Sequence, residues 1–179
     1  MGLRKRTQLI DYRLFFVTTT CNKFLPLIEP IAVKDILIRS LLFCNEKYTA
    51  SIVGYALMPE HIHLIIHFRE DFFLSEYMRD FKKFTSVEIR RYWEKNSPEM
   101  VQKIRHEFAG QKFKVWMDRF DDLHLYSRKV SYTKLNYINN NPVERGLCCA
   151  PEDYTYSSGC FYAGKPENKV PLVHLSDLL

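Results

Sequence analysis

The sequence predicts an α+β fold of the ferredoxin-like, split βαβ type. An antiparallel sheet is expected to carry helices on one face, and a further helix bearing a tyrosine follows toward the C-terminal end. Two observations lead to this prediction. Apolar and polar residues alternate over residues 61–68, which is typical of a half-buried strand. The segments around it follow the order strand, helix, strand, strand, helix, strand, which is the order of a split βαβ sheet.

The first three elements rest on residue type and spacing. Residues 14–20 are mostly β-branched or aromatic, which favours a strand. After Pro30, apolar residues recur at helical spacing from Val33 to Leu42. Residues 50–58 indicate a second strand that stops at Pro59.

The strand over residues 61–68 has two different faces. Ile62, Leu64, Ile66 and Phe68 fall on one face, whereas His61, His63 and His67 fall on the other. One face therefore belongs to the core, and the other presents a row of imidazoles.

The remaining elements are less regular. Residues 74–93 return to helical spacing, and residues 95–110 fit no single pattern. Residues 113–117 are predicted to form the fourth strand. Residues 131–141 are predicted to form the last helix, because Pro142 ends helices and disfavours helical geometry in the residue before it.

Length and composition indicate one domain spanning residues 1–179, with a basic arm at 1–10 and a tail at about 150–179. The net charge of +5 favours a polyanionic partner only weakly. The five cysteines lack CxxC spacing, so neither a disulfide framework nor a zinc knuckle is expected. No apolar run has the length of a membrane span, and the start lacks a signal-peptide pattern, so no membrane association and a cytoplasmic location are expected.

The first chemical candidate is the pair His61 and His63. Residues two apart on a strand point to the same side, roughly 7 Å apart at Cα, so both imidazoles can hold one metal ion. His67 is too far along the strand to join them and is interpreted as a surface histidine. The alternative is that both histidines are polar residues on a solvated sheet face.

The second candidate is Tyr137 with Asn141. If the helix reaches Pro142, these residues lie at i and i+4 on one helix face, where a phenol and an amide oxygen can act together. The alternative is a packing tyrosine and an asparagine at a helix end. The phenol of Tyr137 could serve as a nucleophile. Tyr126 and Tyr132 are alternative nucleophiles nearby, but only Tyr137 lies four residues before the asparagine of the Asn-Pro segment.

These residues lie in segments that resemble the HUH single-tyrosine transposase family (IS200-like), most of all its REP-associated branch. The resemblance covers roughly residues 13–162, in the family's order. Residues 139–140 depart from it, because relatives often carry a bulkier or imidazole residue there. The motifs are residues 58–64 (Met-Pro-Glu-His-Ile-His-Leu), 137–138 (Tyr-Ile), 141–147 (Asn-Pro-Val-Glu-Arg-Gly-Leu), 151–154 and 156–158, with looser matches at 116–120 and 82–86.

The resemblance implies roles for the candidate residues. His61, His63 and Asn141 would bind a divalent metal, Mg²⁺ or Mn²⁺, and Tyr137 would be the nucleophile. The implied reaction is cleavage and rejoining of single-stranded DNA through a 5′-phosphotyrosine link, with recognition of hairpin (REP-like) DNA near the nucleoid. Family members act as monomers or homodimers, and both states stay open. No general base is evident, and Glu60 is interpreted as a solvated residue before the strand.

A basic rim is expected to guide the DNA. Its members would come from one helix and from the N-terminal arm: Arg79, Lys82, Lys83, Arg4, Lys5 and Arg6. Two other functions stay open. One is a catalytically silent protein that binds hairpin DNA, and the other is a metal-dependent phosphodiesterase that uses water as its nucleophile.

Overall fold

The computed structural model describes residues 13–69, 74–108, 111–165 and 168–179. The N-terminal arm, with Arg4, Lys5 and Arg6, lies outside the described residues. The strands are β1 (Leu14–Thr20), β2 (Ala50–Leu57), β3 (His61–Phe68), β4 (Arg105–Phe108), β5 (Gln111–Phe113) and β6 (Asp121–His124). The helices are α1 (Ile31–Lys47), α2 (Leu74–Asn96), α3 (Pro98–Ile104), α4 (Arg128–Glu144) and α5 (Gly159–Tyr162), with short 3₁₀ turns at Asn22–Phe24, Pro151–Asp153 and Leu175–Asp177.

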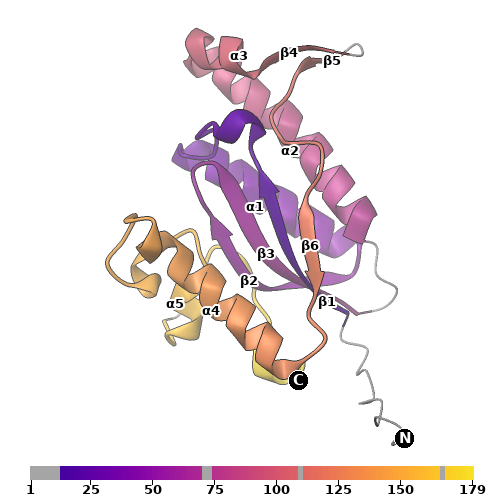
Figure 1. The fold of residues 1–179 in the computed structure, drawn as a ribbon, viewed down its shortest axis with the longest axis vertical. Helices are drawn as coiled ribbons and strands as arrows, with labels where there is room; N and C mark the ends of the chain where they lie inside the picture. The colour runs from indigo at the N-terminus through magenta and orange to yellow at the C-terminus, as the bar shows by residue number, and fades with distance from the viewer. Residues whose placement is uncertain (1–12, 70–73, 109–110, 166–167) are drawn as a thin grey trace, which may run out of the picture.

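The central sheet has four strands in the order β2-β3-β1-β6, and all three pairs are antiparallel. With β6 as the fourth strand, this is the strand order of a ferredoxin-like sheet, so the predicted fold class is confirmed. Figure 1 shows α1 and α2 together on one face of the sheet and α4 on the other. The hairpin of β4 and β5 lies beside α3 at one end of the molecule.

Alternation along the strands divides the interior into two layers. Ile62, Leu64 and Ile66 of β3 pack with the apolar faces of α1 and α2 in the larger core. Ile65, on the opposite face, packs with Leu135 and Ile138 of α4 in a smaller core. The histidine face of β3 is therefore partly covered by a helix rather than open to solvent.

The outer edge of β2 is covered by the C-terminal tail. The Leu57 N–H donates to the Tyr156 carbonyl at 2.9 Å, and the Ser158 N–H donates to the Tyr55 carbonyl at 2.9 Å. Pairing along a sheet edge removes free backbone groups that would otherwise pair with another chain. The tail is thus attached to the sheet beside α4.

The predicted fourth strand is wrong. β6 at Asp121–His124 fills that position, whereas residues 115–117 pass the end of β1, where Val115 accepts from Asn22 N–H at 2.7 Å. The residues of β6 are all exposed and include two aspartates, so no apolar alternation marks the strand. Trp116 is instead a core residue whose indole N–H donates to Thr85 Oγ1 at 3.0 Å.

The predicted end of the last helix is also wrong, because α4 continues through Pro142 to Glu144. A proline inside a helix removes one backbone hydrogen bond. Contacts on both sides of it hold this turn: Ser158 Oγ donates to Asn139 Oδ1 at 2.6 Å, and Arg145 forms an ion pair with Glu60. Tertiary contacts therefore outweigh the local preference.

Candidate active site

The two histidines of β3 project from the face that α4 covers. Their Nε2 atoms lie 3.0 Å apart, and their ring centroids are 4.6 Å apart. His63 is buried, with 3% of its surface exposed, and His61 is half-buried. The alternation of the strand therefore brings the two imidazoles to one point, as the His-x-His spacing predicts.

Helix α4 places Tyr137 beside this pair. The Tyr137 ring centroid is 5.2 Å from that of His63 and 6.0 Å from that of Phe16, with edge-on geometry in both cases. Tyr137 keeps 39% of its surface exposed, so the residue is in part accessible from solvent. Two segments far apart in the sequence, the strand β3 and the helix α4, are therefore adjacent at this point.

The close approach of α4 to the sheet depends on Gly54 in β2. A Cβ added to Gly54 would lie 2.9 Å from Leu135 Cδ1, closer than real Cβ contacts. The absence of a side chain therefore lets α4 pack directly on β2. One helical turn beyond Leu135, the Asn139–Ser158 hydrogen bond fixes the position of α4 along the sheet.

Asn141 has the properties of a third ligand. It is buried, with 7% of its surface exposed, and its Oδ1 makes no hydrogen bond of normal geometry. It also lies near the His61 ring: burial lowers the pKa of that imidazole, and the contact with Asn141 partly opposes this effect. A buried amide oxygen that accepts no hydrogen bond is costly unless another group, such as a metal ion, satisfies it.

The protonation of the histidines suits metal binding. Burial lowers the pKa of His63 to about 3, and the positive charges of His61 and Lys134 act in the same direction. Burial also lowers the pKa of His61, although Glu60 opposes this effect. Neutral imidazole is the form that binds metals. Among the described residues, no three His, Cys, Asp or Glu side chains cluster as ligands, so a third ligand next to this pair would be the amide of Asn141.

Three residues near the site were not predicted from the sequence. Thr18 Oγ1 lies 2.8 Å from His63 Nδ1, and Lys134 Nζ lies 5.4 Å from the centre of the Tyr137 ring. Phe16 stacks on His63 at 5.7 Å between centroids. Thr18 and Phe16 could have been found by their alternation in β1 on the face opposite Val17, and Lys134 by its place one helical turn before Tyr137.

Glu60 differs from the solvated residue that the sequence suggests. Only 13% of its side chain is exposed, its Oε1 lies 3.4 Å from His61 Nδ1, and Arg145 donates to the same oxygen. Arg145 follows the last turn of α4, so the pair joins the start of β3 to the end of the tyrosine-bearing helix. Both residues lie within the two motifs quoted above, which is the signal that could have identified them.

The basic residues of α2 lie apart from this site, because α2 packs on the other face of the sheet. Lys82 donates from Nζ to the carbonyls of Met117 at 2.7 Å and Asp118 at 3.0 Å, so it holds the loop before β6. Arg79 pairs with Asp80 at 3.1 Å, and Lys83 is exposed. The structure therefore does not bring these three residues together with Tyr137.

The rival tyrosines have other surroundings. Tyr132 packs against the smaller core, with the Arg128 guanidinium 5.8 Å from its ring centre. Tyr126 lies just before α4 and is 52% exposed. Of these tyrosines, Tyr137 is the one for which a ring contact with His63 is found.

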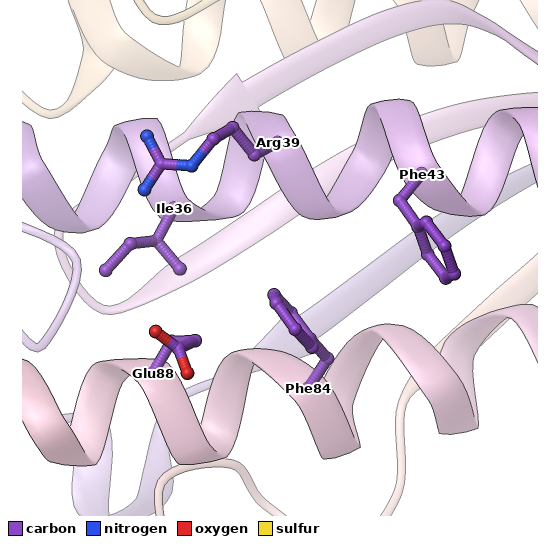
Figure 2. A pocket seen from close by; sticks show the side chains of 5 residues that line it. All are labelled: Ile36, Arg39, Phe43, Phe84 and Glu88. Atoms are coloured by element: carbon purple, nitrogen blue, oxygen red, sulfur yellow. The ribbon is translucent and has the colours of Figure 1, made fainter.

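A separate hollow lies between α1 and α2. Figure 2 shows Ile36, Arg39 and Phe43 from α1 facing Phe84 and Glu88 from α2 across it. Its lining is mainly apolar, and it belongs to the helical layer on the face of the sheet opposite α4. The histidines and Tyr137 are not part of its lining. Separately, no helix of the described residues is long and apolar enough to cross a membrane.

Known proteins share this architecture. A solved REP-associated tyrosine transposase bound to a REP hairpin superimposes with a TM-score of 0.65 at 20% sequence identity, covering 92% of this chain and 86% of that one. A protein from Deinococcus radiodurans R1 described as a candidate transposase matches with a TM-score of 0.51 at 12% identity, covering 77% of this chain and 97% of that one. These matches show a shared fold, and no curated protein gives a match. The sequence profile of the family "Transposase IS200 like" matches residues 8–141, and the chain therefore belongs to the IS200-like transposase family.

Proposed function

We propose that this protein cleaves and rejoins single-stranded DNA with Tyr137 as nucleophile and with a divalent metal, Mg²⁺ or Mn²⁺, held by His61, His63 and Asn141. The observation that carries the proposal is the contact between the Tyr137 and His63 rings, 5.2 Å apart, next to a buried and unsatisfied amide oxygen. Membership of a transposase family supports the same chemistry.

The donor set fits such an ion. Two imidazole nitrogens face one point, the amide oxygen of Asn141 is near, and the exposed side of Tyr137 leaves room for a substrate. A mixed nitrogen and oxygen set with open positions suits Mg²⁺ or Mn²⁺ better than a closed structural zinc site. When bound, the ion supplies Lewis-acid polarisation of a phosphodiester.

Tyr137 performs the covalent step. Its phenolic oxygen gives up its proton and bonds to the phosphorus, the bond from phosphorus to the 3′ oxygen breaks, and that oxygen takes up a proton and leaves as a 3′-hydroxyl. The DNA stays linked to the enzyme by a 5′-phosphotyrosine bond. A second 3′-hydroxyl then attacks this link and releases Tyr137, so strand transfer consists of two similar exchanges.

The surroundings of Tyr137 favour a polyanion. The Lys134 ammonium lies 4.6 Å from the Phe16 ring centre and 5.4 Å from that of Tyr137, so a positive charge stands beside the nucleophile. A phosphate approaching Tyr137 would meet this charge, which attracts DNA in a salt-dependent manner.

The proposed substrate is single-stranded or hairpin DNA. The REP-associated transposase of similar fold was solved with a REP hairpin, and we extend hairpin binding to this chain. Chromosomal DNA as substrate accords with a cytoplasmic, nucleoid-associated location. Because all four proposed site residues come from one chain, we propose that a monomer can carry the complete site, and a homodimer is compatible with it as well. We also propose that residues 1–179 form one catalytic domain.

The decisive experiment detects a protein–DNA adduct. Single-stranded oligonucleotides copied from the DNA flanking the gene are incubated with the protein and Mn²⁺, and denaturing gels show any covalent complex. We expect an adduct that disappears with Tyr137→Phe and with chelator. Tyr126→Phe, which removes another exposed phenol, is the control and is expected to retain the adduct.

Other results would contradict the proposal in distinct ways. Cleavage without an adduct, surviving Tyr137→Phe, would indicate a phosphodiesterase that uses water. Tight hairpin binding with neither cleavage nor adduct would indicate a silent DNA-binding protein.

A further inference from the structure

The Nδ1 atom of each histidine, which points away from the site, lies near a different protein oxygen. His63 Nδ1 lies 2.8 Å from Thr18 Oγ1 on β1, and His61 Nδ1 lies 3.4 Å from Glu60 Oε1. The inner nitrogens face each other, with 3.0 Å between the two Nε2 atoms. Both rings are therefore oriented with Nε2 toward the site and Nδ1 toward a protein oxygen.

This orientation has a chemical consequence. A neutral imidazole carries one hydrogen, on either Nδ1 or Nε2. The 3.0 Å contact between the Nε2 atoms needs a hydrogen on one of them. If one ion takes both Nε2 lone pairs, that hydrogen must leave Nε2, and both rings then carry their hydrogen on Nδ1. Each Nδ1–H needs an acceptor, because an unmatched buried donor is costly.

Glu60 is held in place by Arg145. Its carboxylate is mostly buried, with 13% of the side chain exposed, and Arg145 binds the same Oε1 that faces His61. A carboxylate behind a ligating histidine fixes the ring orientation and increases its basicity. Because Arg145 follows α4, the position of Glu60 is coupled to the helix that carries Tyr137 and Asn141.

We propose that Glu60 and Thr18 are positioning residues that accept the Nδ1 hydrogens of His61 and His63 and so leave both Nε2 atoms free to bind the metal. Arg145 holds Glu60 in place. This inference rests on the proposed function, because it assumes that the histidine pair binds a divalent ion. It adds the residues that select the binding form of each histidine.

The test measures Mn²⁺ affinity of the full chain by titration calorimetry. Thr18→Val removes the hydroxyl with little change in volume, and Glu60→Gln removes the charge while keeping an oxygen. Each is expected to weaken Mn²⁺ binding by about 10- to 100-fold. Thr18→Ser, which restores the hydroxyl, is expected to bind within about twofold of the wild type, a rescue that a purely structural role would not show.

A control and a second readout complete the test. Glu88→Gln breaks another Glu–Arg ion pair, the one between Glu88 and Arg91 at 2.7 Å on α2, and is expected to leave Mn²⁺ affinity unchanged. In Mg²⁺-saturated protein with ¹⁵N-labelled histidine, NMR should show the hydrogen on Nδ1 of both site histidines. A hydrogen on Nε2 of either ring would contradict the inference.

The outcomes separate the inference from the function on which it rests. If the wild type binds no Mn²⁺, both the metal site and this inference are overturned. If the wild type binds Mn²⁺ and both Thr18→Val and Glu60→Gln bind equally well, the inference alone is wrong. Thermal unfolding of each variant identifies loss of fold, and in that case Thr18→Ser and the NMR readout on the wild type still decide.

Discussion

The burial of His63 should make the metal-free protein sensitive to acid. Burial lowers the pKa of this imidazole from 6.5 to about 3. The unfolded chain therefore binds a proton at pH values where the folded protein does not. The contribution of neutral His63 to the free energy of unfolding is fully present above pH about 6.5 and is lost as the pH falls from there toward about 3.

The size of the effect follows from the difference between the two pKa values. One unit of pH in this window corresponds to roughly 1.4 kcal/mol. At about pH 5, the wild type should have lost ~2 kcal/mol of unfolding free energy through His63, relative to about pH 7.5. Solvent screens this effect little, because His63 is only 3% exposed.

Urea unfolding in the presence of chelator, at about pH 7.5 and about pH 5, measures this loss. His63→Gln lacks the titrating group, so its loss between the two pH values should be smaller than that of the wild type by ~2 kcal/mol. His67→Gln, a half-buried histidine of the same strand, is the control and should keep most of the loss. Equal losses in the wild type and His63→Gln, within about 0.5 kcal/mol, would refute the reasoning.

Three further predictions concern packing and ligands. Gly54→Val should lower the free energy of unfolding by about 1–3 kcal/mol, because its side chain would collide with Leu135; urea unfolding checks this. Lys82→Met should lower the free energy of unfolding by about 1–2 kcal/mol, because backbone carbonyls of the loop before β6 lose their donor. Substitution of the exposed neighbour, Lys83→Met, should change the free energy of unfolding little, and urea unfolding of both variants checks this. Asn141→Ala should abolish measurable Mn²⁺ binding in calorimetry, whereas Asn141→Asp, which keeps an oxygen, should retain it. Equal Mn²⁺ binding by the wild type and Asn141→Ala would show that the amide is not a metal ligand.

Local pattern was sufficient wherever one face of an element is buried. The strand over residues 61–68 was predicted with its observed bounds, because a two-residue period shows directly in the order of apolar and polar residues. The first strand over residues 14–20 was predicted equally well. The strand at Asp121–His124 was not, since its residues are exposed and its pairing with β1 depends on backbone hydrogen bonds that any sequence can make.

The proposed ligands and nucleophile could also be selected from the sequence, because the spacing of His61 and His63 on a strand, and of Tyr137 and Asn141 on a helix, places each pair on one face. The distance between the histidine pair and the helix pair could not be predicted from these spacings. That distance depends on a glycine in β2 and on a hydrogen bond between Asn139 and the tail.

By itself, the sequence determined the fold class, through the order of its strands and helices, and the two faces of the histidine strand. It also placed His61 with His63, and Tyr137 with Asn141, on one face of their elements, because these spacings match periods of two and 3.6 residues. Only the tertiary structure decided which face α4 covers, that Glu60 is mostly buried and pairs with Arg145, and that Lys82 binds a loop. The physical reason is the same in each case. The burial and partners of a polar side chain depend on residues distant in sequence, and no local period records them.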